Sequence, residues 1–162
     1  MSVTTDMVAS FRKPGAVMKR HLAFGRREDR ALIYLMASCL MFFVAKTPVL
    51  SRDAHLNSTD IGPALGSQIL IWMFIIPLVL YFLAGVLRVL LRIFGCKGAD
   101  WYETRLALFW SLLVITPISL LNGLTEGLLG KGTESAIVAG AGVLLFSWVL
   151  FGSLRAACKG AS

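Results

Sequence analysis

The segment from Leu106 to Leu121 is almost wholly apolar, and it constrains the fold more than any other part of the chain. Asp100 and Glu103 precede it with the spacing of a capping box, in which each side chain satisfies a backbone N–H at a helix start. Pro117 is expected to kink this helix. A hydrocarbon core of about 30 Å takes roughly 20 apolar residues to cross, so the segment is predicted to span a membrane.

Three further apolar runs repeat this pattern, and the sequence therefore predicts an all-α membrane protein with four transmembrane helices. The predicted spans cover about residues 31–50, 65–92, 105–122 and 136–154. Because 57% of the 162 residues are hydrophobic, the chain is too apolar for an ordinary soluble domain. One membrane domain, residues 31–154, is expected to hold most of it. The second run is longer than a bilayer needs, so whether it contains a broken or re-entrant helix stays open.

Residues 1–30 form a basic, partly apolar leader, which Pro14 and Gly15 divide into two short pieces. Each piece is typical of an amphipathic interfacial helix, with apolar side chains toward the acyl chains and cations at the depth of the phosphates. A disordered basic tail is the alternative. The candidate residues for binding lipid headgroups are Arg12, Lys13, Lys19, Arg20, Arg26 and Arg27.

Lysine and arginine are distributed unevenly between the two ends of the predicted spans. Residues 1–30 carry seven, residues 88–105 four and the short tail 155–162 two, which makes thirteen against the three of Lys46, Arg52 and Lys131. The positive-inside rule then predicts that both termini are cytoplasmic. The net charge of +7 indicates membrane topology and anionic lipid rather than nucleic acid, because the basic residues lie beside apolar spans.

Three stretches of the chain resemble bacterial members of the Yip1 family of multi-spanning membrane proteins. They read FRKPGAVMKRHLAFGRREDRALIYLMAS, LIWMFIIPLVLYFLAGVLRVLLRIFG and WYETRLALFWSLLVITPISLLNGL, and together they cover most of the chain. The resemblance implies a protein of the bacterial cytoplasmic (inner) membrane that organises membrane or binds partners. Eukaryotic members are linked to small GTPases, generally have five spans and carry an acidic-aromatic motif before the first. Four spans are predicted here and that motif is missing, so a small GTPase is not an expected partner.

Residues that could support catalysis or bind a metal are few. His21 lies in the leader and His55 in the loop on the opposite side of the membrane, so neither a Ser-His-Asp arrangement nor a histidine metal site is expected. The chain is predicted to be no enzyme and to need no cofactor. Cys39 is expected to be a small buried hydrophobe, whereas Cys96 and Cys158 are interpreted as surface or lipidated thiols, with no structural disulfide.

Asn122 and Glu126 lie four residues apart, on one helical face at the end of the third span. An acid at membrane depth can carry protons or ions, so this pair is a candidate transport site. The glycines at 123, 127 and 130 indicate instead that the helix is ending, which would place Glu126 in water. A small transporter or channel is therefore kept as an alternative function.

Small residues recur four apart in the third and fourth spans. The pairs Gly123 and Gly127, and Ala136 and Gly140, would let helix backbones approach closely. Such a contact can lie within the monomer or against another protein. A homo-oligomer or a membrane complex is therefore the expected protein partner, and an accessory or assembly subunit of a larger complex is a further alternative. The first span is expected to end at Thr47-Pro48, and residues 123–135 to form a glycine-rich turn.

Overall fold

The computed structural model describes residues 3–96, 98, 100–130 and 132–159. Its elements are all helical, in the order α1 (Val3–Arg12), α2 (Pro14–Ala23), α3 (Glu28–Leu56), α4 (Ile61–Leu70), η1 (Ile71–Ile75), α5 (Ile76–Ile93), α6 (Trp101–Leu129) and α7 (Thr133–Lys159). Among the described residues, α3, the continuous α4–η1–α5, α6 and α7 are each long and apolar enough to cross a membrane. The predicted all-α fold with four spans is confirmed.

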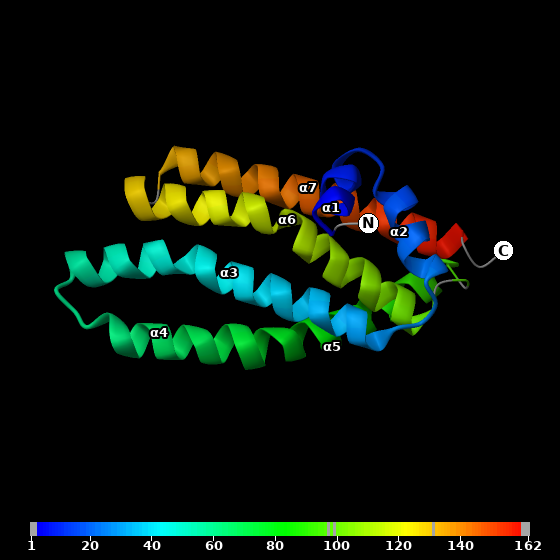
Figure 1. Ribbon diagram of the computed structural model, residues 1–162, viewed down its shortest axis with the longest axis horizontal. Coiled ribbons are helices and arrows are strands. Elements are labelled where there is room, and N and C mark those ends of the chain that lie inside the picture. Colours follow the sequence, from blue (N-terminus) through cyan, green and yellow to red (C-terminus); the bar gives the residue numbers. More distant parts are fainter. Residues whose placement is uncertain (1–2, 97, 99, 131, 160–162) are drawn as a thin grey trace.

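The four spans lie side by side along the long axis of the molecule, and the chain reverses direction after each one (Figure 1). The α3–α4 and α6–α7 connections lie at one end of the bundle. Both chain termini lie toward the other end, together with α1 and α2. An even number of spans returns the chain to the side from which it started.

Helix α6 is the centre of the bundle, because it packs against α3, α5 and α7. Leu106, Phe109, Trp110 and Val114 on α6 are fully buried. The α4–η1–α5 span is the most peripheral, and α5 leaves side chains such as Phe82, at 74% exposure, on the outer surface. Within a membrane these apolar side chains would face lipid.

The capped start of α6 and the bend in its middle are as predicted from the sequence. Asp100 Oδ1 accepts a hydrogen bond from the Trp101 backbone N–H at 2.8 Å, and Glu103 Oε2 accepts one from the Asp100 N–H at 2.9 Å. The predicted capping box is thus present. Pro117 lies inside the helix, and Figure 1 shows α6 bending about midway along its length, as expected of an interior proline.

The helices run further than the sequence indicated. Helix α3 continues past Pro48 to Leu56, so the predicted exit at Thr47-Pro48 is wrong and the α3–α4 loop shrinks to residues 57–60. Helix α6 continues through Gly123 to Leu129, so the turn expected at residues 123–135 shrinks to residues 130–132. Both errors have one cause, since packing between neighbouring helices maintains them through prolines and glycines that would end an isolated helix.

The long second span is neither broken nor re-entrant. It runs without interruption from Ile61 to Ile93, and a π-helical turn at Ile71–Ile75 widens it locally. Pro77 follows directly after this turn. Because proline has no N–H to donate and its ring crowds the preceding turn, local widening there keeps the helix continuous.

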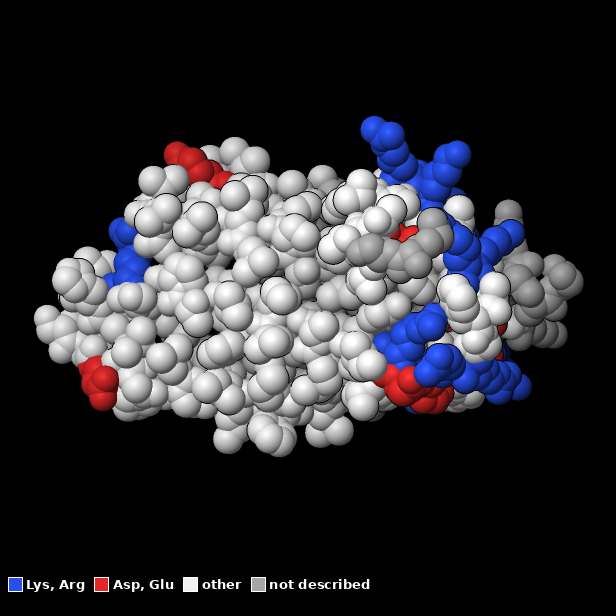
Figure 2. Space-filling view, in the orientation of Figure 1, with Lys and Arg blue, Asp and Glu red and all other residues white. Residues whose placement is uncertain are grey.

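Charged residues gather at the two ends of the bundle. Most blue Lys and Arg atoms in Figure 2 lie at the end that carries α1 and α2, few charges lie at the opposite end, and the belt between them on this face is uncharged. Lys97 and Lys131, which enter the count of basic residues, lie outside the described residues. The pattern fits a transmembrane bundle, and the orientation of that bundle stays a prediction.

Candidate functional site

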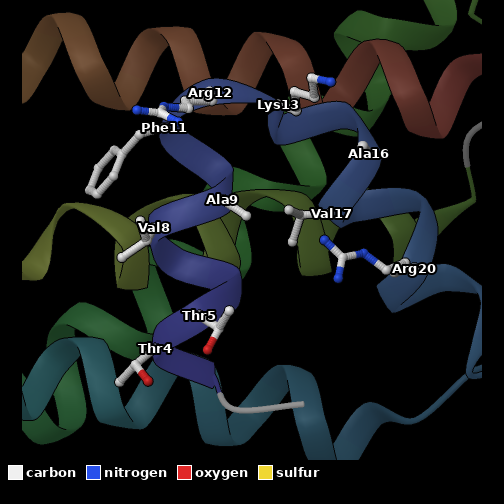
Figure 3. Close-up of a pocket in the computed structure, with 10 residues that line it drawn as sticks. All are labelled: Thr4, Thr5, Val8, Ala9, Phe11, Arg12, Lys13, Ala16, Val17 and Arg20. Atoms are coloured by element: carbon white, nitrogen blue, oxygen red, sulfur yellow. The ribbon is translucent and has the colours of Figure 1, made fainter.

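The predicted leader forms two helices that separate at Pro14, as expected. Pro14 is the first residue of α2, where a missing N–H and a fixed φ are tolerated. Figure 3 shows α1 running transverse to α3 and α7. The interfacial position of the two helices stays a prediction. The apolar side of α2 nevertheless differs from expectation, because Val17 and Met18 are fully buried in the protein core rather than turned toward acyl chains.

Helix α2 is docked on α7 through small residues. A Cβ added at Gly152 would lie 2.5 Å from Pro14 Cγ, and one added at Gly15 would lie 3.3 Å from the Gly152 carbonyl oxygen. The Cβ added at Gly15 would also lie 3.5 Å from the Cβ of Ala156, which is one turn further along α7. The spacing of Gly152 and Ala156 is the signal for this contact, and our sequence analysis missed it.

A buried polar cluster joins α1, α2, α3 and α6. Trp110 Nε1 donates to Ser10 Oγ at 3.0 Å, and Ser10 Oγ donates to the Asp6 carbonyl oxygen at 2.8 Å. The His21 ring lies 4.4 Å from the Trp110 ring, and its Nδ1 lies 3.5 Å from Tyr34 Oη. These contacts fix the position of the leader relative to the bundle.

The charge state of His21 depends on this cluster. The side chain is 6% exposed, and burial lowers the pKa of His21 below its ordinary value of 6.5. The Asp6 carboxylate, 3.9 Å from His21 Nε2, acts in the opposite direction, whereas Arg30 and Arg20 also lower the pKa. Burial is the largest of these effects, so the docked leader favours a neutral imidazole.

An open cleft of about 810 Å³ lies between α1 and α2 of the leader (Figure 3). Its wall combines cations, hydroxyl groups and apolar side chains: Thr4, Thr5, Val8, Ala9, Phe11, Arg12, Lys13, Ala16, Val17 and Arg20. We call this surface the leader cleft. Basic groups beside an apolar floor match a phospholipid, whose phosphate is anionic and whose chains are apolar.

The six predicted headgroup residues are all exposed, but they divide into two groups of three. Arg20, Arg26 and Arg27 form ion pairs with Asp6 at 3.2 Å, Asp100 at 2.5 Å and Asp29 at 3.2 Å. No carboxylate of the described residues pairs with the other three, which are Arg12, Lys13 and Lys19. The second group, which we call the free triad, is available for an external anion.

At the opposite end of the bundle, Asn122 and Glu126 lie inside α6 rather than beyond it. The Glu126 side chain is 12% exposed, and its Oε2 lies 3.9 Å from Lys46 Nζ on α3. The expectation of a water-exposed acid is therefore wrong, because the helix continues through Gly123 and Gly127 and ends only before Gly130. Transport through this pair is not tested by the structure and stays a prediction.

The two pairs of small residues behave differently. Gly123 and Gly127 meet α3 closely, since a Cβ added at Gly123 would overlap the Ala45 carbonyl oxygen and one at Gly127 would lie 2.5 Å from Pro48 Cβ. These glycines pack within the monomer. Ala136 and Gly140 on α7 are exposed, and a Cβ added at Gly140 meets no heavy atom of the described residues within 4 Å.

The cysteines are only partly as predicted. Cys39 is buried in the core, as expected. Cys96 and Cys158 form a disulfide with a Cα–Cα distance of 5.7 Å, so the expectation of no structural disulfide is wrong. The two residues are 62 positions apart, and only the folded bundle brings the end of α5 to the end of α7.

The two histidines lie at opposite ends of the bundle, as predicted. His21 contacts Tyr34 near the start of α3, whereas His55 lies in the last turn of the same helix. The 21 residues between Tyr34 and His55 correspond to about 30 Å of helix. The two imidazoles therefore cannot act in one site.

Comparisons of the chain with protein-family models, with curated proteins and with solved structures return no match. The Yip1 resemblance therefore stays a hypothesis drawn from the sequence. The function is argued below from the leader and its cations.

Proposed function

We propose that the protein is a non-enzymatic integral membrane protein of Yip1 type, which organises its membrane by binding anionic lipid headgroups through the leader. The observation that carries this proposal is the free triad. Arg12, Lys13 and Lys19 are exposed, and none of the described carboxylates neutralises them. Each Lys or Arg near an anionic membrane surface contributes roughly 1 kcal/mol of attraction.

The docking of α1 and α2 on the bundle supports the same function. Val17 and Met18 anchor α2 in the core, and Trp110 holds Ser10 of α1. The cations are therefore presented from a folded platform rather than from a flexible tail. Less conformational entropy is lost on binding when the binding residues are already ordered.

We place the protein in a bacterial cytoplasmic membrane, with the leader and both termini on the cytoplasmic side. The uneven count of basic residues supports this orientation. The cytoplasmic leaflet is negatively charged, which is the surface that the free triad would attract.

The test compares two triple variants of the full-length protein in nanodiscs that contain anionic lipid. One variant replaces the free triad, Arg12, Lys13 and Lys19, by Gln. The other replaces three arginines that are paired and lie outside the leader cleft, namely Arg26, Arg27 and Arg105, the last of which lies 2.6 Å from Glu28. Both remove three positive charges, so a difference between them cannot come from net charge. Native mass spectrometry after gentle extraction counts the anionic lipids that each protein retains.

We expect the free-triad variant to lose most retained anionic lipid, because three attractions of roughly 1 kcal/mol together correspond to about a hundredfold in affinity. The paired variant should retain more lipid and unfold at a lower temperature, because it breaks ion pairs of the leader. Undiminished lipid retention by the free-triad variant would reject the proposal. A stoichiometric protein partner in the same spectra would instead identify an accessory or assembly subunit, whereas a homo-oligomer with bound anionic lipid would favour membrane organisation.

A further inference from the structure

A second pocket, of about 480 Å³, lies between the leader and the start of α3, at the end of the bundle that carries both termini (Figure 1). We call it the α3 pocket. Its volume is within the range of pockets that enclose small molecules. Its wall combines three arginines, two aspartates, two further polar side chains and three apolar ones: Arg20, Arg27, Arg30, Asp6, Asp29, His21, Tyr34, Val3, Phe24 and Ile33.

The α3 pocket has one positive charge that no carboxylate balances. Asp6 lies 3.2 Å from Arg20, and Asp29 lies 3.2 Å from Arg27, so each aspartate is already paired. No carboxylate in the described part of the chain lies within ion-pair distance of Arg30. Since the docked leader favours a neutral imidazole, the wall carries one net positive charge, which matches a ligand with a single negative charge.

Arg30 is half-buried, and its guanidinium group is oriented without being neutralised. Its Cζ lies 4.8 Å from the centre of the Phe24 ring, which attracts a cation but does not pair with it as a carboxylate would. Guanidinium groups bind phosphate through two parallel N–H···O bonds. Arg30 also lies in the first turn of α3, where the partial positive charge of the helix dipole favours an anion.

An apolar path leads from the rim of the α3 pocket along the outer face of α3. Ile33 on the rim, Leu40 and Val44 are all exposed, and Ala37 lies between the first two. Their spacing of three or four residues places them on one side of the helix, over about 16 Å. Because α3 is long and apolar enough to cross a membrane, this side can lie against one acyl chain.

We propose that the α3 pocket binds one molecule of a singly charged anionic phospholipid. The phosphate accepts hydrogen bonds from the Arg30 guanidinium, and one acyl chain lies along Ile33, Leu40 and Val44. A fatty acid has the same charge, but its small carboxylate would leave most of the pocket empty. The site shares no residue with the free triad, and it goes beyond the proposed function because it holds one lipid at a fixed position.

The experiment counts the lipids retained by the full-length protein in detergent, by native mass spectrometry after a wash at about 1 M salt. Attraction to exposed cations is largely screened there, since the Debye length falls to about 3 Å. Three probes are compared: a phosphatidylglycerol, the diacylglycerol with the same chains and no phosphate, and glycerophosphoglycerol, which has the headgroup and no chains. We expect one phosphatidylglycerol per protein chain to be retained, and neither of the other two probes.

Arg30→Gln is expected to lower the affinity for phosphatidylglycerol at least about tenfold, because charge-assisted hydrogen bonds to the phosphate are lost. Arg92→Gln is the matched control. Arg92 is exposed in the last turn of α5, outside the pocket, so its replacement removes the same charge and should leave retention unchanged. Ile33→Glu places a carboxylate one turn from Arg30 at an exposed position, and it should abolish retention. Its result decides the proposal if Arg30→Gln does not fold.

Undiminished retention of phosphatidylglycerol by Arg30→Gln or by Ile33→Glu would overturn the proposal. Retention of diacylglycerol or of glycerophosphoglycerol at the level of phosphatidylglycerol would also overturn it, because one chemical part of the lipid would then be unnecessary. The variant that replaces the free triad by Gln should keep this one lipid after the wash. Its loss from that variant would assign the lipid to the free triad, so the failures of the two proposals can be distinguished.

Discussion

Gly123 and Gly127 lie on the side of α6 that meets α3, where the backbones of the two helices are closest. The Ala45 carbonyl oxygen and the Pro48 ring occupy the space that a side chain at these positions would need. Gly140 has the same residue type in the same kind of helix, yet it faces no neighbour among the described residues. A comparison of substitutions at Gly123 and Gly140 therefore distinguishes the effect of close helix packing from the effect of the low helix propensity of glycine.

Gly123→Ala is expected to lower the free energy of unfolding by about 1–3 kcal/mol, the range typical of an overpacked interior, because the added methyl group forces α3 and α6 apart. Gly140→Ala is the matched control, and it should be neutral or stabilising by up to about 1 kcal/mol through helix propensity. Thermal unfolding in detergent, followed by circular dichroism, measures both. A Gly123→Ala variant as stable as Gly140→Ala would contradict the close contact between α3 and α6.

The docked leader is expected to loosen as the pH falls, and His21 is the cause. Burial lowers the pKa of His21, so the folded state binds this proton less readily than the unfolded chain, whose pKa is near 6.5. The contribution of neutral His21 to the free energy of unfolding is therefore complete above about pH 6.5. It decreases as the pH falls below 6.5, and it levels off once His21 is protonated in both the folded and the unfolded state. Arg20 and Arg30 strengthen the effect, and Asp6 weakens it.

Hydrogen exchange of α1 and α2 measures this dependence, as protection factors at pH 7.5 and pH 5.5. We expect lower protection at pH 5.5 in the wild type and a flat profile in His21→Gln. His55 lies at the far end of α3 and serves as the internal control, since His55→Gln should leave the pH dependence of the leader unchanged. A pH dependence that survives His21→Gln would assign the effect to another group.

Contacts between residues close in the sequence could be predicted, and long-range ones could not. Asp100 and Glu103 are three apart, and their capping box follows directly from the sequence. Ser10 and Trp110 are 100 residues apart, and no local pattern connects a serine in a basic leader with a tryptophan in a span. The Cys96–Cys158 disulfide was missed for the same reason.

At the scale of elements, the sequence indicated which segments are helical but not where the helices end. The apolar runs determined which segments are helical. Where each helix ends depends on capping groups supplied by other helices. Arg52, which we predicted only as one of three cations at the sparsely charged end, donates from Nη1 to the carbonyl oxygens of Leu128 at 2.8 Å and Gly127 at 3.3 Å. These are among the carbonyl groups that the last turn of a helix leaves without intrahelical partners.

Arg52→Gln is expected to fray the last turn of α6 and to lower the free energy of unfolding by about 1 kcal/mol, because a charge-assisted hydrogen bond is lost at a partly exposed site. Lys46→Gln is the control. Lys46 is 3.9 Å from Glu126 and its side chain is 49% exposed, so its loss should have a smaller effect. Faster hydrogen exchange confined to residues 126–130 in Arg52→Gln would support the capping role. Equal fraying in both variants would show that general charge loss is responsible.

The four-span architecture of the whole molecule followed from composition, whereas the orientation of the bundle is a prediction that rests on charge alone. Four apolar runs are sufficient to predict four spans, and an even number brings both termini to the basic end. The docking of the leader was beyond prediction, because it depends on small residues of α7 that lie near the other end of the sequence.

The disulfide and the orientation form one prediction for the whole molecule. Cys96 follows the end of α5 and Cys158 lies in the last turn of α7, and both of these helix ends lie at the end of the bundle that carries the leader (Figure 1). The cytosol keeps protein thiols reduced, whereas disulfides persist in oxidising compartments. If the basic end is cytoplasmic, as the positive-inside rule predicts, the Cys96–Cys158 disulfide of the structure should be reversible in the cell. It should be reduced to two thiols in growing cells and should form again after exposure to oxidant.

A Cys39→Ala variant removes the third thiol, and its remaining cysteines can then be labelled with maleimides in intact cells. We expect a membrane-permeant maleimide to label both residues without any reductant, and an impermeant one to label neither. Labelling by the impermeant reagent, obtained only after treatment with an impermeant phosphine, would show instead an intact disulfide on the outer face. That result would reverse the orientation and place the free triad on the side opposite the anionic cytoplasmic leaflet. The proposed headgroup function would then lose the surface that it requires, so the oxidation state of one cysteine pair tests the electrostatic argument for the whole molecule.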